Sequence, residues 1–595
     1  MSPSSPYICL CCRLAVRSQP RISPYRNFSI YHPLRSLPSS PPSRPPTAPK
    51  PVPNVKHIRE NADQYSKNCI DRNYRFAADY PSRIQSLAKE ASHIQHALKE
   101  PRSRIKNIEN DIAKLARALA QLEKQGDSSK ERPSEEKPIA DVDFQSLEDP
   151  DTVEQLDALR VEAKRLKDES QQMVDRREEC MLEIQNLALS LPNLTSGETP
   201  IGSEPRVVGY INYDPKNSPS YTMASPTGPS SAPSHVAIGT ELGLIDFTSS
   251  ATSTGWGWYF LTNEGCLLEH ALVQYALTVA RQKGWKPVSP PSVVYSHIAE
   301  ACGFQPRDVN NEQQIWTIQQ TERDKAANKP QRSLTGTAEI PLAAMYANQE
   351  IQAEQLPIKL VGASRCYRAE AGARGVDTKG LYRVHEFTKV EMFAWADNYA
   401  DSSFTLNPSS PTTIKKRAKD GGDKPEAKIT SISIFSEMLS IQTEILSSLN
   451  LPCRILEMPS SDLGASAARK RDIEVLFPSR INMSTQETGD SSTPCTTTIS
   501  SDVFSSGGDS NGWGEVTSTS ICTDYQSRRL GTRLRGGHER TGSRFPDTVN
   551  GTAMAVPRVL AAILEHGWDE KLRGVVVPEV LRPFMGGIEL IRKQA

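Results

Sequence analysis

The sequence predicts two domains: a helical hairpin near the N-terminus, then a larger body of mixed strands and helices. The chain has 595 residues, more than a single core usually serves. Between Ile84 and Leu191, apolar residues recur at alternating steps of three and four, which is typical of coiled-coil helices. From about Val207 onward, strand-like apolar runs such as Leu356–Val361 alternate with amphipathic stretches such as Ile432–Leu449.

Composition argues against several classes of protein. Lys plus Arg and Asp plus Glu both total 70, so the net charge of zero does not indicate a nucleic-acid partner. The 11 cysteines share no metal-ligand spacing, which favours reduced thiols over a disulfide framework or a zinc site. No run of about 18 apolar residues occurs, so no membrane span is expected.

The N-terminal segment has the composition of a mitochondrial targeting sequence. Asp and Glu are absent before Glu60, whereas arginine, serine and proline are abundant. The stretch Arg26-Asn27-Phe28-Ser29 resembles a matrix processing site. We therefore expect a transit peptide over residues 1–28, a Pro/Ser-rich linker over 29–52, and a location in the mitochondrial matrix. A disordered basic terminus is the alternative interpretation.

The hairpin is expected within residues 53–195. A first seam of apolar residues runs from Ile84 to Leu122 and a second from Leu156 to Leu191, with a polar, turn-rich segment between them. Two such helices joined by one loop fold back as an antiparallel pair. Pro101 occupies the one missing position of the first seam, so we expect it to kink or break that helix. Charge alone does not distinguish an RNA-binding arm from a structural or dimerising coiled coil.

The body carries a pattern suited to nucleotide chemistry. Arg368 and Glu370, expected on one strand with one residue between them, would project to the same face. Beside a nucleotide, the guanidinium can bind a phosphate through two donors while the carboxylate accepts from an adenine amine. A Gly-containing loop then leads to a second strand carrying Phe387 and Glu391. An R-x-E pair alone is weak evidence, because surface strands often alternate charges.

The whole stretch from Cys366 to Glu391 resembles motif 2 of the class II aminoacyl-tRNA synthetases, and in detail that of the seryl-tRNA synthetases. Five further segments resemble that family in the same order: Leu191–Leu194 at the exit of the arm, the T-x-E loop Leu334–Leu342, the ATP and magnesium segment Glu515–Ser520, motif 3 Asn550–Arg558 and the C-terminal signature Val577–Phe584. The likeness extends from about Pro53 to the C-terminus. One departure is Arg471, which stands where an aromatic or aliphatic residue is usual.

The resemblance implies an α+β fold with the class II synthetase antiparallel sheet and flanking helices over residues 205–595, plus the N-terminal antiparallel coiled-coil hairpin. Two polar stretches, 402–428 and 482–513, are interpreted as surface insertions. Motif 1, from about Val236 to Gly284, would form a homodimer interface. The implied activity is a serine–tRNA ligase, which activates L-serine with ATP to seryl-adenylate and then transfers serine to the 3′-terminal adenosine of tRNA(Ser) in mitochondrial translation.

The resemblance also implies roles for individual residues. Arg368 and Arg558 would be catalytic, bridging the α-phosphate with the serine carboxylate and holding the γ-phosphate, respectively. The implied ATP-binding set is Arg368, Ala369, Glu370, Val384, His385, Glu386, Phe387, Glu515, Val516, Thr517, Ser518 and Arg558. The implied serine-binding set is Thr337, Glu339, Arg368, Glu391, Asn550 and Thr552. Glu515 and Ser518 would hold Mg²⁺ with ATP, since hard cations take oxygen ligands.

The arm acquires a role from the same resemblance. In the family this hairpin grips the long variable arm of the tRNA, and basic residues on the first helix would contact its backbone: Arg102, Arg104, Lys106, Lys114 and Arg117.

Three rival interpretations remain to be weighed. A catalytically dead paralogue should have lost Arg368, Glu391, Glu515 or Arg558. A threonyl or prolyl enzyme lacks the hairpin and usually carries a C-terminal anticodon domain. A purely structural coiled coil would not carry the ordered motifs.

Overall fold

The structure is a computed structural model that describes residues 48–127, 150–216, 232–304, 314–369, 380–397, 430–481, 512–536 and 544–594. These residues fall within one compact unit, Pro45–Ala595. The expected transit peptide, most of the linker, the loop of the hairpin, the first insertion and Glu370 lie outside the described residues. No helix in the described part of the chain is both long enough and apolar enough to span a membrane.

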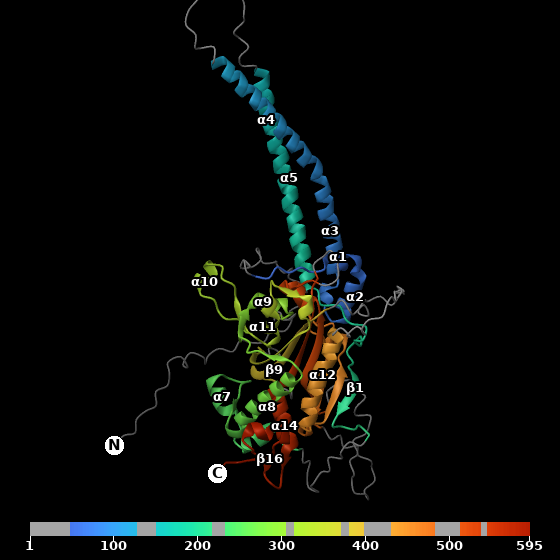
Figure 1. Cartoon of the computed structure of the whole chain (residues 1–595), viewed down its shortest axis with the longest axis vertical. Coiled ribbons are helices and arrows are strands. Elements are labelled where there is room, and N and C mark those ends of the chain that lie inside the picture. The colour runs from blue at the N-terminus through green and yellow to red at the C-terminus, as the bar shows by residue number, and fades with distance from the viewer. Residues whose placement is uncertain are drawn as a thin grey trace, which may run out of the picture. The chain divides into compact units, whose positions relative to one another are not determined.

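The N-terminal region is helical. Its elements are α1 (Val55–Glu60), α2 (Ala62–Asp71), α3 (Tyr80–Ala97), α4 (Lys99–Asp127) and α5 (Pro150–Ser190). Helices α3 and α4 pack against α5, which runs in the opposite direction (Figure 1). The expected antiparallel hairpin is therefore present.

Proline interrupts the first helix of the hairpin as expected. Helix α3 ends at Ala97 and α4 begins at Lys99, so the break falls at Leu98. Leu98 N still donates to Ile94 O at 2.9 Å, and Arg102 N donates to Leu98 O at 3.3 Å. Pro101 has no N–H for the Ala97 carbonyl, and its ring crowds that carbonyl. The helix therefore bends three residues before the proline.

The seam of the hairpin is narrow and apolar. In the middle of the arm Ile108 packs against Ala163 and Leu166. Near the base the seam widens, because Ile84 and Cys180 share a cluster with residues of α1 and α2. Outside the seam the arm carries exposed ion pairs between its two helices.

The body is built on an eight-stranded sheet with the order β1-β10-β11-β12-β14-β9-β8-β4. Its strands are β1 (Arg206–Ile211), β4 (Lys286–Pro287), β8 (Ile358–Tyr367), β9 (Glu386–Ala396), β10 (Cys453–Glu457), β11 (Arg469–Leu476), β12 (Trp513–Thr523) and β14 (Asp547–Ala555). All neighbours pair antiparallel except β4, which runs parallel to β8. The predicted antiparallel sheet is confirmed, with that single parallel edge added.

Short strands form smaller sheets around the large one. They are β2 (Ile245–Asp246) with β3 (Phe260–Leu261), β5 (Val293–Tyr295) with β6 (Arg332–Leu334), β7 (Glu350–Gln352) with β13 (Arg533–Arg535), and β15 (Trp568–Asp569), β16 (Gly574–Val576) and β17 (Leu590–Arg592). Short helices connect these pieces: α6 (His235–Glu241), α7 (Phe247–Ser253), α9 (Ser296–Ala301), α10 (Glu322–Ala326), α11 (Glu339–Ala343) and α13 (Tyr525–Leu530).

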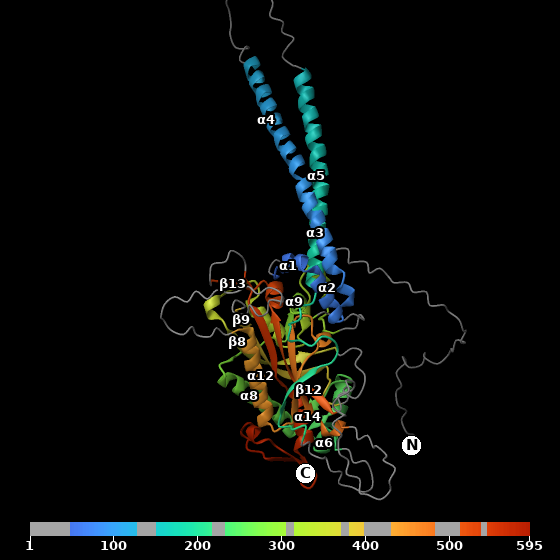
Figure 2. The same ribbon diagram turned by 90° about the vertical axis from the view of Figure 1, so that its right-hand side faces the viewer.

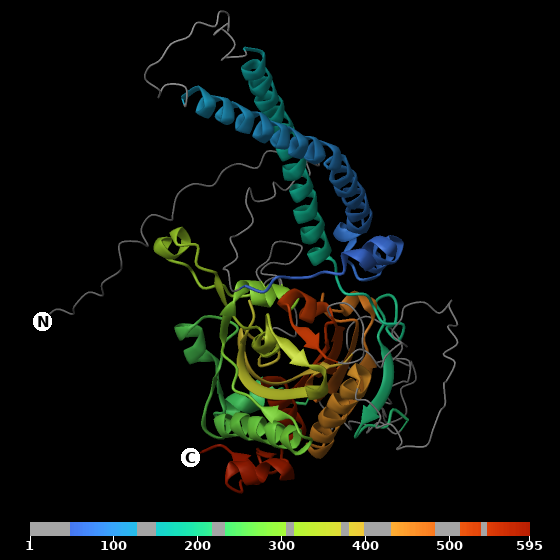
Figure 3. The same ribbon diagram turned by 45° about the horizontal axis from the view of Figure 1, so that its top comes forward.

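Three longer helices cover one face of the large sheet. They are α8 (Asn263–Gln282), α12 (Ser431–Ser448) and α14 (Val556–Gly567) (Figures 2 and 3). Their apolar sides join the sheet in the main core, which includes Leu272, Phe435 and Leu560. Thr519 of β12 donates from Oγ1 to Gln442 of α12, at 2.9 Å. Since side chains alternate along a strand, Ser518 beside it faces away from the helices.

The second predicted insertion, 482–513, overlaps the start of β12, while residues 482–511 lie outside the described residues. Trp513, which the composition placed at the end of that insertion, is the first residue of β12 and is 2% exposed. Glycine, serine and threonine continue into the strand, so composition alone could not locate its start.

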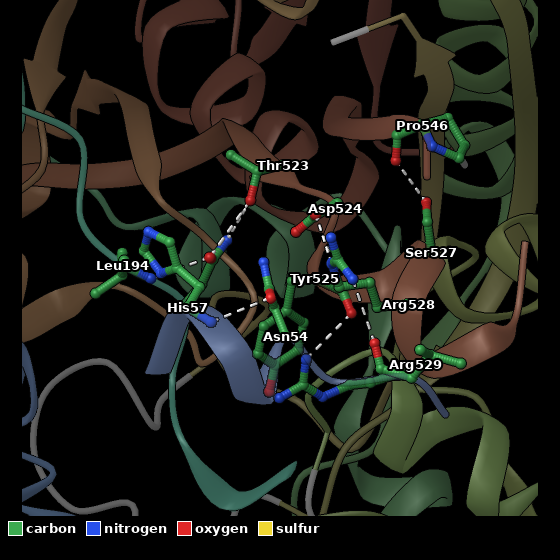
Figure 4. A network of polar contacts seen from close by, with 12 residues as sticks. Asn54, His57, Leu194, Thr523, Asp524, Tyr525, Ser527, Arg528, Arg529 and Pro546 are labelled. Atoms are coloured by element: carbon green, nitrogen blue, oxygen red, sulfur yellow. Dashed lines mark hydrogen bonds and ion pairs between the residues drawn. The ribbon is translucent and has the colours of Figure 1, made fainter. Parts of the chain in front are cut away.

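The base of the arm is fastened to the body by buried polar contacts. Arg72 of the arm is 1% exposed and donates to the carbonyls of Asn193 and Gly464. The Asn193 amide donates to the Cys522 carbonyl at 2.9 Å, and Arg529 of α13 donates to the Leu191 carbonyl at 3.2 Å. Figure 4 shows α13 beside α1 in this network, including the Asp524–Arg528 pair. Paired backbone carbonyls and buried cations make this junction specific.

Candidate active site

Four neighbouring strands bring the predicted motifs together. The sheet order places β12, β14, β9 and β8 side by side. Arg368 follows the end of β8, and Glu391 lies on β9. Glu515 lies on β12, and β14 leads directly into α14, which carries Arg558. Segments far apart in the chain therefore converge on the face of the sheet that α12 leaves uncovered.

A cleft open to solvent, with about 530 Å³ of empty space, lies among Arg368, Glu515 and Arg558. Its lining is rich in charged and polar groups. It consists of Arg368, Tyr382, Arg383, Val384, Phe387, Lys389, Glu515, Val516, Thr517, Ser518, Thr552, Ala555, Pro557 and Arg558. Of the residues predicted for ATP, the cleft gathers Arg368, Val384, Phe387, Arg558 and the stretch 515–518.

Arg368 lies at the mouth of the β8–β9 pair. Strand β8 ends at Tyr367, so Arg368 lies one residue beyond the strand on which it was expected. Its backbone N–H donates to the His385 carbonyl at 2.9 Å, which extends the pairing of the two strands by one residue. Its guanidinium carbon lies 5.2 Å from the centroid of the Phe387 ring. A cation held over an aromatic face is stabilised there and remains available to an anion.

Arg558 and Glu515 are paired across the cleft. Arg558 Nη1 donates to the Glu515 carbonyl at 2.9 Å and to its Oε2 at 3.1 Å. The same guanidinium donates from Nε to the Tyr382 carbonyl and lies over the Tyr382 ring, 4.6 Å from its centroid. Pro557 occupies the first turn of α14, where a missing N–H costs nothing. The motif 3 arginine is thus fixed from three sides.

The electrostatic surroundings keep Glu515 ionised. Burial raises the pKa of this carboxyl, but the charges of Arg558, Lys470 and Arg368 together lower it to about 2. At neutral pH the cleft therefore presents an anionic oxygen ligand from Glu515 and a hydroxyl from Ser518. These are the donor types that Mg²⁺ prefers, so the residues fit the predicted metal. Among the described residues, no group of three or more His, Cys, Asp or Glu could hold a metal ion alone.

Beneath the cleft lies a buried carboxylate with one oxygen unused. Glu391 is 0% exposed, and its Oε2 lies 2.6 Å from Lys389 Nζ. Thr552, its cross-strand partner on β14, donates from Oγ1 to the same oxygen at 3.2 Å. Glu391 Oε1 is buried and accepts no hydrogen bond from any residue that the structure describes. A buried, unsatisfied acceptor at this depth is costly unless a bound donor completes it.

A second buried carboxylate belongs to the T-x-E loop. Glu339 begins α11, and its backbone N–H donates to Thr337 Oγ1 at 3.3 Å. Its Oε1 accepts a hydrogen bond of 2.6 Å from Gln526 Nε2. Burial and the nearby Glu391 carboxylate raise the pKa of Glu339 to about 7, while Lys389, the Gln526 bond and Arg368 act in the opposite direction. The loop reaches this position because Tyr367 N donates to the Thr335 carbonyl.

Several predicted residues take other positions. Ala369 donates its N–H to the Gln314 carbonyl, and the His385 ring lies among Trp256, Trp258 and Trp316. Neither of these two residues lines the cleft. Glu386 does not line it either, and its Oε1 lies 3.8 Å from Arg365 Nε. Asn550 Oδ1 lies 3.4 Å from Cys522 Sγ, on the strand that carries Thr552.

Sequence reasoning missed several residues of the site, among them Lys389, Tyr382 and Gln526. Lys389 had a signal, since Phe387, Lys389 and Glu391 alternate along one strand and so share a face. Tyr382, under the Arg558 guanidinium, had none. Gln526 lies 187 positions from Glu339, and no local pattern links the two.

The fold and this cleft together define a class II aminoacyl-tRNA synthetase. A family model described as tRNA synthetase class II core domain (G, H, P, S and T) matches residues 320–405 and 418–567. The chain is also similar in fold to the seryl-tRNA synthetase of Pyrococcus horikoshii complexed with ATP. The TM-score is 0.62 at 24% identity, covering 91% of this chain and 100% of that one.

Sequence comparison narrows the class. The mitochondrial serine–tRNA ligase of Saccharomyces cerevisiae is 37% identical over 427 residues, which is 71% of this chain and 77% of that protein. The mitochondrial serine–tRNA ligase of Schizosaccharomyces pombe is 32% identical over 532 residues, covering 89% and 88%. The serine–tRNA ligase of Rhodopirellula baltica is 34% identical over 444 residues, covering 74% and 85%. The chain belongs to the serine–tRNA ligase family.

Proposed function

We propose that this chain activates L-serine with ATP to seryl-adenylate and pyrophosphate, and then transfers serine to the 3′-terminal adenosine of tRNA(Ser) in mitochondria. Membership of the serine–tRNA ligase family supports the overall reaction. The observation that carries the residue assignments is the meeting of Arg368 and Arg558 with the buried Glu391 in and below one cleft. The two arginines suit anions, and Glu391 suits a small polar side chain.

Activation requires two anions to meet. The serine carboxylate is already ionised at pH 7, so the site needs positioning and fixed positive charge more than it needs a general base. Arg368, held over Phe387, would bridge the serine carboxylate and the α-phosphate of ATP. Arg558 would hold the γ-phosphate, exchanging its Glu515 partner for a phosphate oxygen.

The metal would lie in the phosphate half of the cleft. Glu515 and Ser518 would hold Mg²⁺, which supplies neutralising charge to the phosphates when bound. The pKa of about 2 supports this assignment for Glu515, since the carboxylate stays ionised throughout the physiological range. With two protein ligands, the ion would complete its coordination from ATP and water.

Serine selection would fall to the buried carboxylates. Glu391 Oε1, which has no partner among the described residues, would accept from the substrate hydroxyl, and Glu339 would receive the ammonium group. Alanine would leave Glu391 Oε1 unsatisfied, and sites of this kind discriminate by roughly 10⁴ or more. Threonine would be excluded by the space around its extra methyl group.

The arm would supply the tRNA contact. Helix α4 of the arm carries exposed cations outside its apolar seam, including Arg102 and Lys106. Backbone phosphates of a long tRNA variable arm are a fitting partner for such a row of charges.

A homodimer would form through the motif 1 region. Within it, Trp256, Phe260 and Leu267 are 61%, 47% and 44% exposed. Large apolar side chains grouped in one stretch of a soluble enzyme are typical of an interface between subunits. The dimer would let the arm of one subunit serve the cleft of the other.

A mitochondrial location is supported by the two fungal relatives, which are both named as mitochondrial enzymes. The acid-free, arginine-rich first 59 residues support the matrix as the compartment.

The proposed reaction is tested by ATP–pyrophosphate exchange with each of the standard amino acids, using protein that begins at Ser29. We expect exchange with serine alone, followed by charging of tRNA(Ser). Exchange with threonine in place of serine, or with no amino acid, would overturn the substrate assignment.

A further inference from the structure

A buried glutamine contacts the carboxylate that is proposed to bind the serine ammonium group. Gln526 of α13 is 0% exposed, and its amide lies between two polar side chains. Nε2 donates to Glu339 Oε1 at 2.6 Å, and Oε1 accepts from Thr548 Oγ1 at 2.8 Å. An ionised carboxylate can only accept, so it requires the amide nitrogen on its side. The threonine hydroxyl then completes the opposite end of the amide.

The Gln526 amide connects the two elements that would form the serine site, the T-x-E loop and strand β14. Thr548 lies on β14, the strand that also carries Thr552, the hydrogen-bond partner of Glu391. Glu339 belongs to the T-x-E loop at the start of α11. Gln526 therefore spans the gap between the element that would hold the ammonium group and the strand that would help to hold the hydroxyl.

We propose that Gln526 is a positioning residue for serine recognition, which fixes Glu339 in place and keeps it in its ionised, ammonium-binding form. This inference rests on the proposed function and adds to it a residue that never touches the substrate. Glu339 Oε2 makes no hydrogen bond to the described residues, so the Gln526 bond would hold one oxygen and leave the other for the ammonium group.

The electrostatic setting makes this bond consequential. The groups that act on Glu339 are Glu391 and Lys389 from β9, Arg368 after β8, Cys302 after α9 and Cys522 from β12. Burial raises the pKa of both thiols, so they stay neutral across the physiological range. Glu339 itself has a pKa of about 7, and the Gln526 hydrogen bond lowers it. Near neutral pH, small changes at Gln526 therefore decide how much of the carboxylate is charged.

The test is the serine KM of Gln526→Met across pH 6.0 to 8.5, measured by ATP–pyrophosphate exchange. Methionine matches the size of glutamine but cannot donate, so the pKa of Glu339 should rise. Less of the carboxylate is then ionised at pH 7, and the serine KM should rise about fivefold for the loss of one such hydrogen bond. At pH 8.5 the difference should shrink below twofold, with the ATP KM unchanged at every pH.

A matched control separates this role from a structural one. Gln442 of α12 is also 0% exposed, and its amide donates to the backbone carbonyls of Ser518 and Thr552 without contacting Glu339. Gln442→Met should alter serine KM by a factor that does not change with pH. Thr548→Val, which removes only the hydroxyl that orients the Gln526 amide, should reproduce a weaker form of the Gln526→Met profile. It also serves as the decisive variant if Gln526→Met does not fold.

The outcomes are separable from those of the proposed function. If the parent protein shows no serine-dependent exchange, the proposed function fails first. If the parent is active but Gln526→Met and Thr548→Val give pH-independent changes like those of Gln442→Met, or no change in serine KM, then Gln526 is not a positioning residue and this inference alone is wrong.

Discussion

The arm and the catalytic body use charged residues in different ways. In the arm, Arg104 pairs with Glu162 and Lys167 with Glu109 while more than half of each basic side chain stays exposed. In the body, Lys389 and Glu391 form a pair whose side chains are 8% and 1% exposed. Arg469 and Glu457 form another, at 10% and 0%.

This difference predicts that charges in the arm adjust the affinity for tRNA, whereas charges in the body determine the chemical reaction. Exposed ion pairs contribute about 0–1 kcal/mol and are screened by salt, so their cations can turn to phosphates at little cost. Breaking a buried pair leaves an uncompensated charge and costs about 3–5 kcal/mol. Substitutions in the arm should therefore tune tRNA binding in small steps, whereas substitutions in the cleft should abolish whole functions.

The largest effect is expected at Arg368. Arg368→Ala removes the cation that would join the two reacting anions, so exchange should fall on the order of 10³-fold or more. The melting temperature and tRNA binding should stay near those of the parent. Arg365→Ala is the matched control, since Arg365 lies on β8 three residues before Arg368, is 47% exposed and pairs with Glu269 outside the cleft. Near-normal exchange by Arg368→Ala would contradict its assigned role.

Removing the outer arm should impair the transfer of serine to tRNA but not the activation of serine. Replacing residues 99–172 by a flexible linker of about six residues keeps the base of the hairpin, including the Arg176–Glu90 pair. Serine-dependent exchange should stay within about twofold, while aminoacylation should fall on the order of 100-fold, because the phosphate contacts are lost. Both rates are measured on the same preparation. Unimpaired charging would show that the arm does not grip tRNA.

Breaking the buried Lys389–Glu391 pair should raise the KM for serine more than the KM for ATP. Lys389→Met leaves Glu391 without its cation, so serine KM should rise on the order of 10–100-fold. Steady-state exchange at varied serine and varied ATP measures the two KM values separately. Lys359→Met is the control, because Lys359 of β8 forms a less buried pair with Glu437 of α12, and neither residue lines the cleft. A rise in ATP KM alone would contradict the assignment of Glu391 to serine.

Acid should weaken serine binding before it weakens ATP binding. Glu339 must be ionised to hold an ammonium group, and its pKa of about 7 means that it gains a proton as pH falls below 7. Serine KM should then rise about fivefold between pH 7 and pH 6, and the rise should approach tenfold per pH unit at lower pH. Glu515 has a pKa of about 2, so it stays ionised and ATP KM should change little between pH 6 and 8. A serine KM that is flat across this range would contradict the role of Glu339.

The smallest effects are expected in the arm. Lys106 is exposed and makes no ion pair with the residues that the structure describes, whereas Arg104 is held by Glu162. Lys106→Gln should weaken tRNA binding a few-fold and lower the slope of affinity against salt by about one charge. Arg104→Gln should cost less affinity for tRNA, because Glu162 already neutralises the Arg104 cation in the free protein. Equal losses for the two variants would show that the pairing is irrelevant to tRNA contact.

The arm was the part of the fold most open to prediction from sequence. Apolar spacing indicated the helices of the hairpin, and the fixed backbone of Pro101 predicted a break in the first one, which lies at Leu98, because both signals act within a few residues. The same local rules placed α12 to within one residue, whereas the predicted run Leu356–Val361 covers only the first part of β8. They could not place the start of β12 at Trp513, where the composition of the insertion runs into the strand.

The candidate site was less accessible, because its contacts join distant segments. Alternation along β9 contained the signal for Lys389, but only strand pairing brings Thr552 opposite Glu391. Arg471 illustrates the same limit. It stands where an apolar residue was expected, yet its Nε donates to the buried Glu457 at 2.7 Å and its guanidinium lies over Phe435. Such partners depend on the register of β10 and β11, which no local pattern encodes.

The most direct measurement is a crystal structure of the protein bound to a non-hydrolysable seryl-adenylate analogue, 5′-O-(N-L-serylsulfamoyl)adenosine. We predict that the sulfamoyl group contacts Arg368, that the ammonium group contacts Glu339, and that the serine hydroxyl donates to Glu391 Oε1. An analogue bound with its amino group or hydroxyl remote from these two carboxylates would contradict the assignment of the cleft.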